Sequence, residues 1–370
     1  MTQFAALETA LAPVQHSVSG VASEEVHDAI KMQQQGLRQA QLTSNAELAN
    51  ALLGGGQSAR QTDLRAKVGG VGGRLLFWEY AERIRRSMRW DVKSMRLLAD
   101  TLRGRALLIC GGGPSIKYDV EKVRYLQQLG GVVLTCNKTY EFFMGLPTPI
   151  IPDFHVMLDP MPWVADYVQT VNPVTKFLIA SSCDPAVLRR LRLKWADCYL
   201  WHAGADFYGV EMPYPILRDE FIHKSWSIVV GQTTVGLRSV PLGYDLGARV
   251  FHMFGLDSSM AQVNGEFKLH AYAKDRPTDA DEGMVTLRTP RGEYQFMTNT
   301  HMSRQVTDFQ DLLDQVLERI KSKAWELIDI RVHGDGMLPT YAASIGMHAD
   351  EDMNLQYCGR RNAASKEEAA

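Results

Sequence analysis

The chain has 370 residues, a length that predicts two domains or one large α/β domain with a helical extension. Apolar residues make up 45% and charged residues 22%, which is typical of a folded protein and excludes wholesale disorder. Lys and Arg number 40 against 42 for Asp and Glu, so the net charge of -2 provides no overall field that would attract nucleic acid or an anionic membrane.

Three features of the sequence predict a cytoplasmic protein. The apolar runs are far shorter than the roughly 20 residues that span a bilayer. The N-terminal stretch lacks the positive charge of a secretory signal. Five cysteines without CxxC spacing indicate neither a disulfide framework nor a zinc site.

Residues 1–95 are predicted to form a helical arm with flexible glycine-rich breaks at 54–56 and 69–73. After the second break, apolar residues recur at spacings of three and four from Phe77 to Met95, which predicts one long amphipathic helix. Basic residues dominate its other face. The favoured interpretation is that this basic face is exposed to solvent. The alternative is that residues 74–98 contact a protein partner or a second copy of the chain. A nucleic-acid-binding patch is a minority interpretation.

From residue 96 to 347 the pattern predicts one α/β domain, a Rossmann-like, doubly wound and mostly parallel sheet with the arm as its N-terminal helical extension. The predicted strands are 106–110, 132–136, 154–158, 176–180, 198–201, 250–254 and 328–332, and the predicted helices are 119–129, 138–144, 162–170, 185–194, 234–246 and 304–323. Residues 255–300 look polar and irregular, and form a candidate lid. Residues 348–370 are predicted to be a flexible tail.

The first strand runs into a glycine turn, Gly111, Gly112 and Gly113, followed by Pro114 and Ser115 at the start of a helix. Glycines allow close backbone approach, and the amides at a helix start attract phosphate, so we predict a phosphate-binding turn; a purely structural turn is the alternative. The sequence lacks the third glycine and the acid of a dinucleotide fingerprint, and also the Gly-Lys-Ser/Thr of a P-loop. NAD binding and simple P-loop chemistry are disfavoured.

Polar residues follow the later strands. Asn137 and Lys138 are placed to bind ribose or phosphate, although Asn137 also suits a helix cap. Asp159 and Asp257 are carboxylates at strand ends, suited to hold Mg²⁺ or, for Asp159, to act as a base; capping and turn formation are the alternatives. Thr233 and Thr234 open a helix and are predicted to complete the nucleotide site, or only to cap that helix.

Histidines near the candidate lid are possible general acids or bases. His270 and His301 have this placement, although a structural role is the more common one for any single histidine. His333 ends the last strand before a glycine turn, where a turn role is favoured over metal binding.

Taken in chain order, these motifs resemble the 6-hydroxymethylpterin diphosphokinase-like family. The matching motifs are Gly111-Gly112-Gly113-Pro114-Ser115, Cys136-Asn137, Pro152-Asp153-Phe154, Leu158-Asp159-Pro160 and Gly255-Leu256-Asp257. Versions encoded in phage genomes look closest, because they share Asp257-Ser258-Ser259, His270-Ala271-Tyr272 and Val332-His333-Gly334-Asp335-Gly336. The resemblance covers about 103–347, and it leaves the arm without a counterpart.

The family implies a Rossmann-like fold and Mg²⁺-dependent transfer of diphosphate from ATP to a hydroxyl acceptor, in the host cytoplasm for a phage protein. The motif order is also similar to bacterial sialyltransferases and nonulosonic-acid transferases, in which a late histidine serves as base; His301 is the nearest candidate by position, and His270 the next. We therefore expect a nucleotide-dependent transferase with a small-molecule acceptor, diphosphokinase-like first and a nucleotide-sugar glycosyltransferase second. A non-catalytic nucleotide-binding or phage structural protein is the alternative from another class.

Overall fold

The computed structural model describes residues 77–207, 210–212, 227–232, 234–263, 265–272, 282–289 and 291–349. The predictions for the arm before residue 77, for Thr233 and for the tail from residue 350 lie outside this part of the chain. Within it, no helix is long and apolar enough to cross a membrane.

Strands and helices alternate along the described residues, as the sequence predicts. The helices are α3 (Phe77–Met88), α4 (Ile116–Gln128), α5 (Thr139–Met144), α6 (Pro185–Leu193), α8 (Val235–Asp245), α9 (Thr300–Lys321) and α10 (Met337–Ser344), with 3-10 helices η1 (Met95–Leu98) and η2 (Pro162–Tyr167). The strands are β1 (Lys93–Ser94), β2 (Ala106–Cys110), β3 (Val132–Cys136), β4 (Phe154–Met157), β5 (Lys176–Ala180), β6 (Asp197–Phe207), β7 (Val210–Met212), β8 (Ile228–Val230), β9 (Val250–Phe254), β10 (Ala261–Val263), β11 (Glu266–Lys268), β12 (Gly283–Thr289), β13 (Gly292–Thr298) and β14 (Asp329–Val332).

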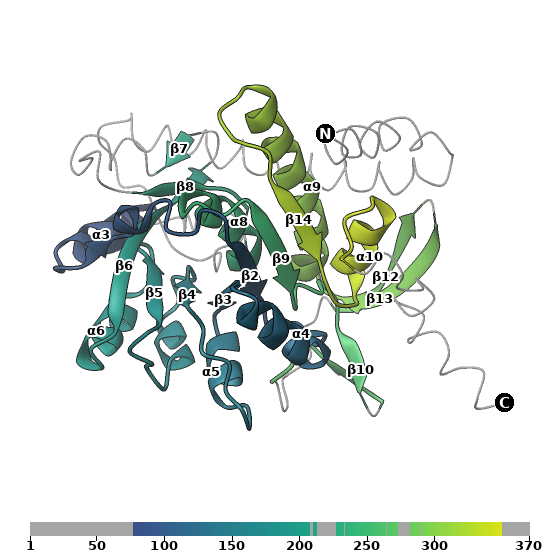
Figure 1. Ribbon diagram of the computed structural model, residues 1–370, viewed down its shortest axis with the longest axis horizontal. Coiled ribbons are helices and arrows are strands. Elements are labelled where there is room, and N and C mark those ends of the chain that lie inside the picture. Colours follow the sequence, from purple (N-terminus) through teal and green to yellow (C-terminus); the bar gives the residue numbers. More distant parts are fainter. Residues whose placement is uncertain are drawn as a thin grey trace, which may run out of the picture.

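The main sheet has the strand order β1-β6-β5-β4-β3-β2-β9-β14, and all of these neighbours are parallel. The chain moves outward from β2 through β3, β4 and β5 to β6, and then returns to place β9 on the other side of β2 (Figure 1). The strand order therefore reverses between β2 and β9. This topology confirms the predicted Rossmann-like, doubly wound α/β fold.

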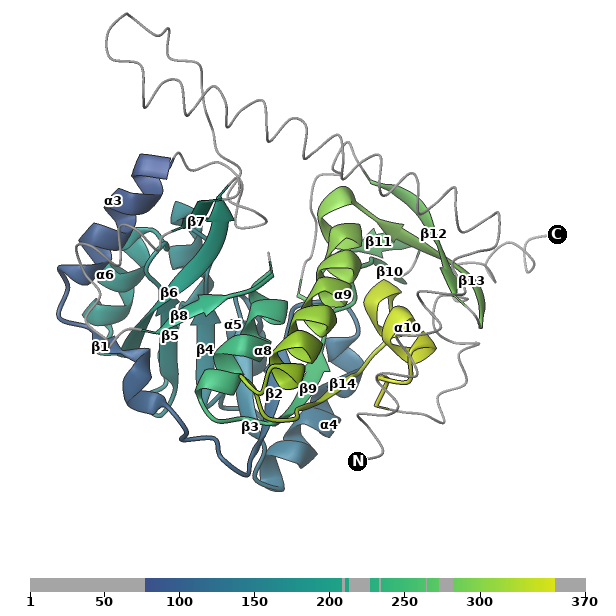
Figure 2. The same cartoon turned by 90° about the horizontal axis from the view of Figure 1, so that it is seen from above.

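Both faces of the sheet are buried, which explains why its central strands are continuous apolar runs. Leu107 and Ile109 of β2 face one layer of the core, and Leu108 and Cys110 face the other. Helices α8 and α9 cover the first layer, while α4 and α5 cover the second (Figure 2).

Helix α3 and the segment after it belong to this core. Ile84 is fully buried and Met95 is 1% exposed. The predicted single helix from Phe77 to Met95 is wrong, because α3 ends at Met88, β1 pairs with β6, and Met95 begins η1. The helical spacing continues across this break because both segments turn apolar side chains toward the same core.

The prediction of an irregular segment over 255–300 is also wrong for its described residues. Two antiparallel hairpins occupy them, β10–β11 and β12–β13. In β13, Tyr294 and Phe296 are buried on one face while Gln295 is exposed, so a period of two is present within a polar sequence. The β12–β13 hairpin lies beside α10, a helix that the sequence analysis also missed (Figure 1).

Candidate functional site

The carboxyl ends of β2 and β9 meet at the point where the strand order reverses. Gly111 N donates to Phe254 O at 2.8 Å, and Gly113 N donates to Gly255 O at 2.8 Å. A Cβ atom on Gly111 would lie 2.5 Å from Gly255 O. The glycine turn is therefore required by the close approach of two backbone segments that are far apart in the sequence.

Most amides of the glycine turn are used within the chain. Those of Gly111 and Gly113 are occupied by the carbonyls after β9, Pro114 has no amide hydrogen, and that of Ser115 donates to Asp257. Among the described residues, none accepts a hydrogen bond from the amide of Gly112. The expected row of exposed amides is thus reduced to one, and phosphate binding by the whole turn stays a prediction.

Asp257 lies at the N-terminus of α4, where the sequence analysis placed a phosphate. Its Oδ2 accepts from Ser115 N at 2.7 Å, and its Oδ1 accepts from Ser115 Oγ at 2.5 Å. Burial raises the pKa of Asp257 to about 8, with Asp335 and Asp119 adding to the increase against the Ser115 hydrogen bonds. The side chain links the turn after β9 to the start of α4.

A short segment after β11 covers the glycine turn. Ala271 is buried, and its N donates to Gly112 O at 3.0 Å. The Tyr272 ring lies over Gly112, and the His270 ring stacks on Tyr272 with a centroid distance of 5.3 Å. His270 is therefore brought to the predicted nucleotide turn. His301, in contrast, lies exposed in the first turn of α9, and no described contact joins it to that turn.

Asn137 follows β3 with a left-handed backbone, φ 51°, which Asn tolerates better than most residues. Its Oδ1 is buried, and no hydrogen-bond partner reaches that atom in the described part of the chain. The N-cap position of α5 is Lys138, so Asn137 does not cap this helix. The Nζ of Lys138, which is exposed, lies 4.9 Å from the centre of the Tyr167 ring.

Asp159 follows β4 at the same edge of the sheet. Its Oδ1 accepts from Met161 N at 2.9 Å, so it also shapes the turn that leads into η2. Burial raises the pKa of Asp159, against the opposing effects of Met161 N and the charge of Arg83. Arg83 of α3 donates a hydrogen bond to Pro160 O. The sequence motifs did not predict a role for Arg83.

Thr234 has the capping role that the sequence left open. It is the N-cap of α8, and its Oγ1 accepts from Leu237 N at 3.4 Å. The same helical turn lies close to the strand ends, because a Cβ on Gly236 would lie 2.5 Å from the Leu256 side chain. Thr234 is therefore near the turn after β9, with its hydroxyl used within the helix.

The other predicted histidine, His333, pairs with His252 through a 2.8 Å contact between its Nε2 and Nδ1 of His252. Burial lowers the pKa of His333 to about 2, with the charge of Lys122 adding to the decrease. A neutral pair packed against the Phe254 ring fits the structural role that the sequence analysis favoured.

A metal site fits these residues only in part. The residues that the structure describes contain no group of three or more His, Cys, Asp or Glu side chains placed to hold a metal ion. Both oxygens of Asp257 face Ser115, so Asp257 does not fit as a metal ligand. Asp159 has one oxygen engaged by Met161 N, and as a single carboxylate it fits a Mg²⁺ ion that is bound mainly by phosphates.

Two aromatic residues were missed as members of this edge. Tyr167 lies near Asp159 and beneath Lys138, and Tyr272 was quoted as part of a motif without a role. Neither carries a sequence signal of its own, because an isolated tyrosine is typical of many environments. Their position depends on the fold, which brings Tyr272 to the ends of β2 and β3 and Tyr167 to the ends of β3 and β4.

Comparisons with known proteins found two similar solved structures and one matching family. The chain is similar to a MAf glycosyltransferase from Magnetospirillum magneticum AMB-1, with 17% sequence identity and a TM-score of 0.49. The matched region covers 74% of this chain and 38% of the glycosyltransferase. A mammalian sialyltransferase is similar with 11% identity and a TM-score of 0.25, covering 58% of this chain and 83% of its own. No curated protein sequence matches the chain. Residues 84–263 match the family described as 6-hydroxymethylpterin diphosphokinase MptE-like, which confirms the resemblance for that segment.

Proposed function

We propose that the chain is a nucleotide-dependent transferase that binds its donor where β2, β3 and β4 end. The observation that carries this proposal is the reversal of strand order between β2 and β9, because open α/β sheets bind their ligands outside the carboxyl ends at such a point. The Gly112 amide and Asn137 Oδ1 lie there without partners in the described residues. The family match over 84–263 supports a transferase.

The donor chemistry that we infer first is diphosphate transfer from ATP or a related nucleotide. The acceptor hydroxyl oxygen forms a bond to the β-phosphorus, the bond between that phosphorus and the oxygen bridging to the α-phosphate breaks, and AMP leaves. The hydroxyl proton passes to the carboxylate of Asp159, whose raised pKa makes it a stronger base. Gly112 N and Lys138 are the groups that face the donor phosphates, and Asn137 Oδ1 accepts from the ribose or the base.

In this proposal, Asp159 is the one side chain that would bind a Mg²⁺ ion. When bound, Mg²⁺ would neutralise charge on the phosphates. Asp159 then has two candidate roles, proton acceptor or ligand of the ion. The dependence of nucleotide binding on Mg²⁺ distinguishes these roles.

The second candidate is a glycosyltransferase that uses a nucleotide sugar. One observation favours it: the His270 ring stacks on Tyr272 directly beside the glycine turn, where a base for an acceptor hydroxyl would lie. Within this alternative, His270 is the candidate base in place of His301. This chemistry has no need of a metal ion, in contrast to diphosphate transfer.

The test is thermal unfolding of the purified chain with ATP, GTP, CTP, CMP, CMP-sialic acid or NAD, each with and without Mg²⁺. A ligand at 100 times its Kd stabilises the folded state by about 2.7 kcal/mol, which is visible as a higher midpoint. A Mg²⁺-dependent shift with ATP or GTP supports the diphosphokinase-like function. A metal-independent shift with the cytidine compounds supports the glycosyltransferase.

Asn137→Asp is the matched variant for this test. It keeps the side-chain size and places a negative charge where we expect the donor, so the nucleotide shift should disappear. Asn172→Asp is the control, because Asn172 lies before β5 at the opposite edge of the sheet, and its shift should equal that of the wild type. The absence of a shift with every compound would leave the non-catalytic alternative standing.

A further inference from the structure

The segment Leu269–Tyr272, here called the strap, holds a tyrosine over the glycine turn. A Cβ on Gly112 would lie 2.9 Å from Tyr272 Cζ and would clash with the hydroxyl group. Gly112 is not among the glycines with positive φ, so its backbone does not require glycine. The space taken by the Tyr272 ring is what requires it.

The surroundings of the Tyr272 ring come from the turns after two neighbouring strands. On one side is Gly112, after β2; on the other is the Thr139 hydroxyl, in the first turn of α5 after β3. The Phe142 ring lies 6.2 Å away by centroid distance. The phenol therefore fills a space between these turns.

The strap is attached to the glycine turn by few polar contacts. Between the described residues of the strap and that turn, one backbone hydrogen bond is present, from Ala271 N to Gly112 O at 3.0 Å. The hairpin that precedes the strap has only three residues in each strand, β10 and β11. Short two-stranded hairpins are marginally stable by themselves, and segments with few backbone hydrogen bonds open most readily.

These observations place an aromatic side chain, on a segment with one backbone hydrogen bond to the turn, in the space where we propose that the donor binds. The strap uses the carbonyl of Gly112 and leaves its amide without an acceptor among the described residues. A ligand with a planar ring and hydrogen-bond acceptors would replace the ring contact with Phe142 and also reach that amide. A nucleotide has both features.

We propose that Tyr272 is a built-in competitor of the nucleotide, whose base occupies the same space once the strap has lifted. That the competing ligand is a nucleotide rests on the proposed function. That Tyr272 occupies the space between Gly112 and Thr139 is independent of it. Nucleotide then binds only to the molecules whose strap is open, and the apparent Kd of the wild type equals the intrinsic Kd divided by the open fraction.

Tyr272→Ala tests the competition directly. We expect its Kd for the nucleotide found by thermal unfolding to fall about tenfold or more, measured by isothermal calorimetry. In stopped-flow binding, the observed rate should level off with nucleotide concentration in the wild type, and rise linearly in the variant. Tyr272→Phe keeps the ring and should behave as the wild type. Tyr118→Ala, which removes an exposed tyrosine of α4, is the control and should leave the Kd unchanged.

A second measurement reports on the space without any nucleotide. The compound p-cresol should raise the unfolding midpoint of Tyr272→Ala and not that of the wild type, because a truncated aromatic leaves a cavity that binds a small ring. If Tyr272→Ala fails to fold, Tyr272→Leu replaces it, with a smaller decrease in Kd expected.

Two results would overturn the proposal, and they can be told apart. An unchanged or higher Kd in Tyr272→Ala, with normal binding by the wild type, means that Tyr272 supports the site or contacts the ligand, and the proposed function survives. Binding of no nucleotide by either protein removes the proposed function and the competition with it, whatever p-cresol does.

Discussion

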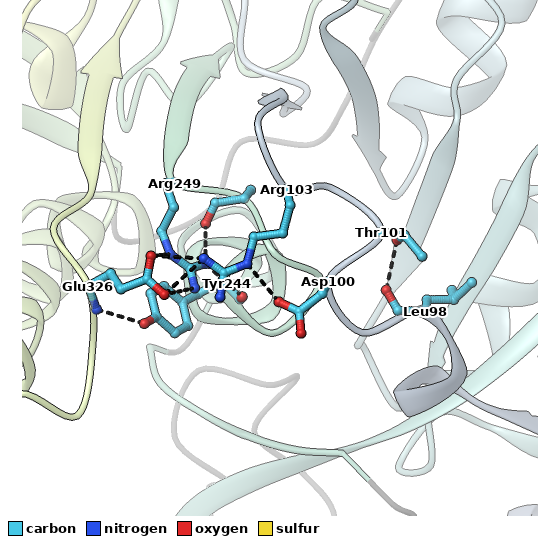
Figure 3. Close-up of polar contacts among 8 residues, drawn as sticks. Leu98, Asp100, Thr101, Arg103, Tyr244, Arg249 and Glu326 are labelled. Atoms are coloured by element: carbon cyan, nitrogen blue, oxygen red, sulfur yellow. Dashed lines mark hydrogen bonds and ion pairs between the residues drawn. The ribbon is translucent and has the colours of Figure 1, made fainter.

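At the amino ends of β2, β9 and β14, charged side chains pair with one another near solvent, whereas at the carboxyl ends of β2 and β9 polar groups are buried and pair with the backbone. In the first region, Arg103 Nη1 lies 2.8 Å from both carboxylate oxygens of Glu326, and Arg249 Nε lies 3.2 Å from one of them (Figure 3). Tyr244 accepts from Glu326 N and stacks on Trp325 at a centroid distance of 4.0 Å.

The two regions differ in the direction of their pKa shifts. At the amino edge, hydrogen bonds from Arg249 and Arg103 lower the pKa of Glu326, so the ionised form is the favoured one. At the carboxyl edge, burial raises the pKa of Asp257 and of Asp159. Buried groups with strongly shifted pKa values are typical of functional sites. Exposed ion pairs are typical of the protein surface, where they contribute little to stability. This contrast supports the proposed site at the carboxyl edge.

The largest expected effect is a pH dependence of stability caused by Asp257. Its folded pKa of about 8 lies above the ordinary value of 3.8, so the folded chain keeps a proton that the unfolded chain has lost. Proton binding by Asp257 therefore adds to the free energy of unfolding, fully so below about pH 4. As the pH rises from 5 to 8, the free energy of unfolding should fall by up to about 4 kcal/mol. Urea unfolding at each pH should show this decrease in the wild type. Asp257→Asn should flatten it, and equal slopes in both proteins would contradict the assignment.

A smaller effect is expected from adding one methyl group at each edge. A Cβ on Gly113 would lie 2.7 Å from Asp257 Cγ and 2.8 Å from Gly255 O, so Gly113→Ala should cost about 3 kcal/mol through overpacking. Gly104 precedes β2 at the amino edge with φ +75° and open space around it. Gly104→Ala should cost about 1 kcal/mol, from its left-handed backbone alone. Chemical denaturation measures both losses, and similar values for the two variants would contradict the expected difference between the two edges.

The smallest effect is expected at the amino edge. Glu326 and Arg103 are 57% and 48% exposed, and such pairs contribute little. Glu326→Gln should lower the unfolding midpoint by less than about 2 °C, and salt near 1 M should remove the difference because it screens exposed charges. A larger, salt-independent loss would show that this cluster is as tightly coupled to the fold as the carboxyl edge.

The sequence predicts the sheet well because its strands are buried on both faces. The predicted strands 106–110, 132–136, 176–180 and 250–254 coincide with β2, β3, β5 and β9. Prediction fails after Met88, because the apolar residues keep a helical spacing although α3 ends there and β1 and η1 follow. It also fails where a short element is stabilised only by packing, as in α10.

The candidate site was predicted by residue type and position along the chain, but not by its contacts. Asn137 and Asp159 were found because polar residues after strands are unusual in a buried sheet. That Asp257 would occupy the helix start at Ser115 has no sequence signature, since the two residues are far apart in the chain. The same holds for Tyr272 over Gly112.

The amino-acid pattern alone is enough to predict the fold class, because apolar periodicity and glycine placement are local properties, which β2, β3, β5 and β9 carry in their own residues. It also determined which strand ends bear polar groups. How these groups are used depends on the folded chain, because the hydrogen bonds of Gly111, Gly113 and Ser115 are made with a segment more than a hundred residues later in the chain. Long-range contacts select among local possibilities, and among the described residues they leave the amide of Gly112 as the one in the turn without an acceptor.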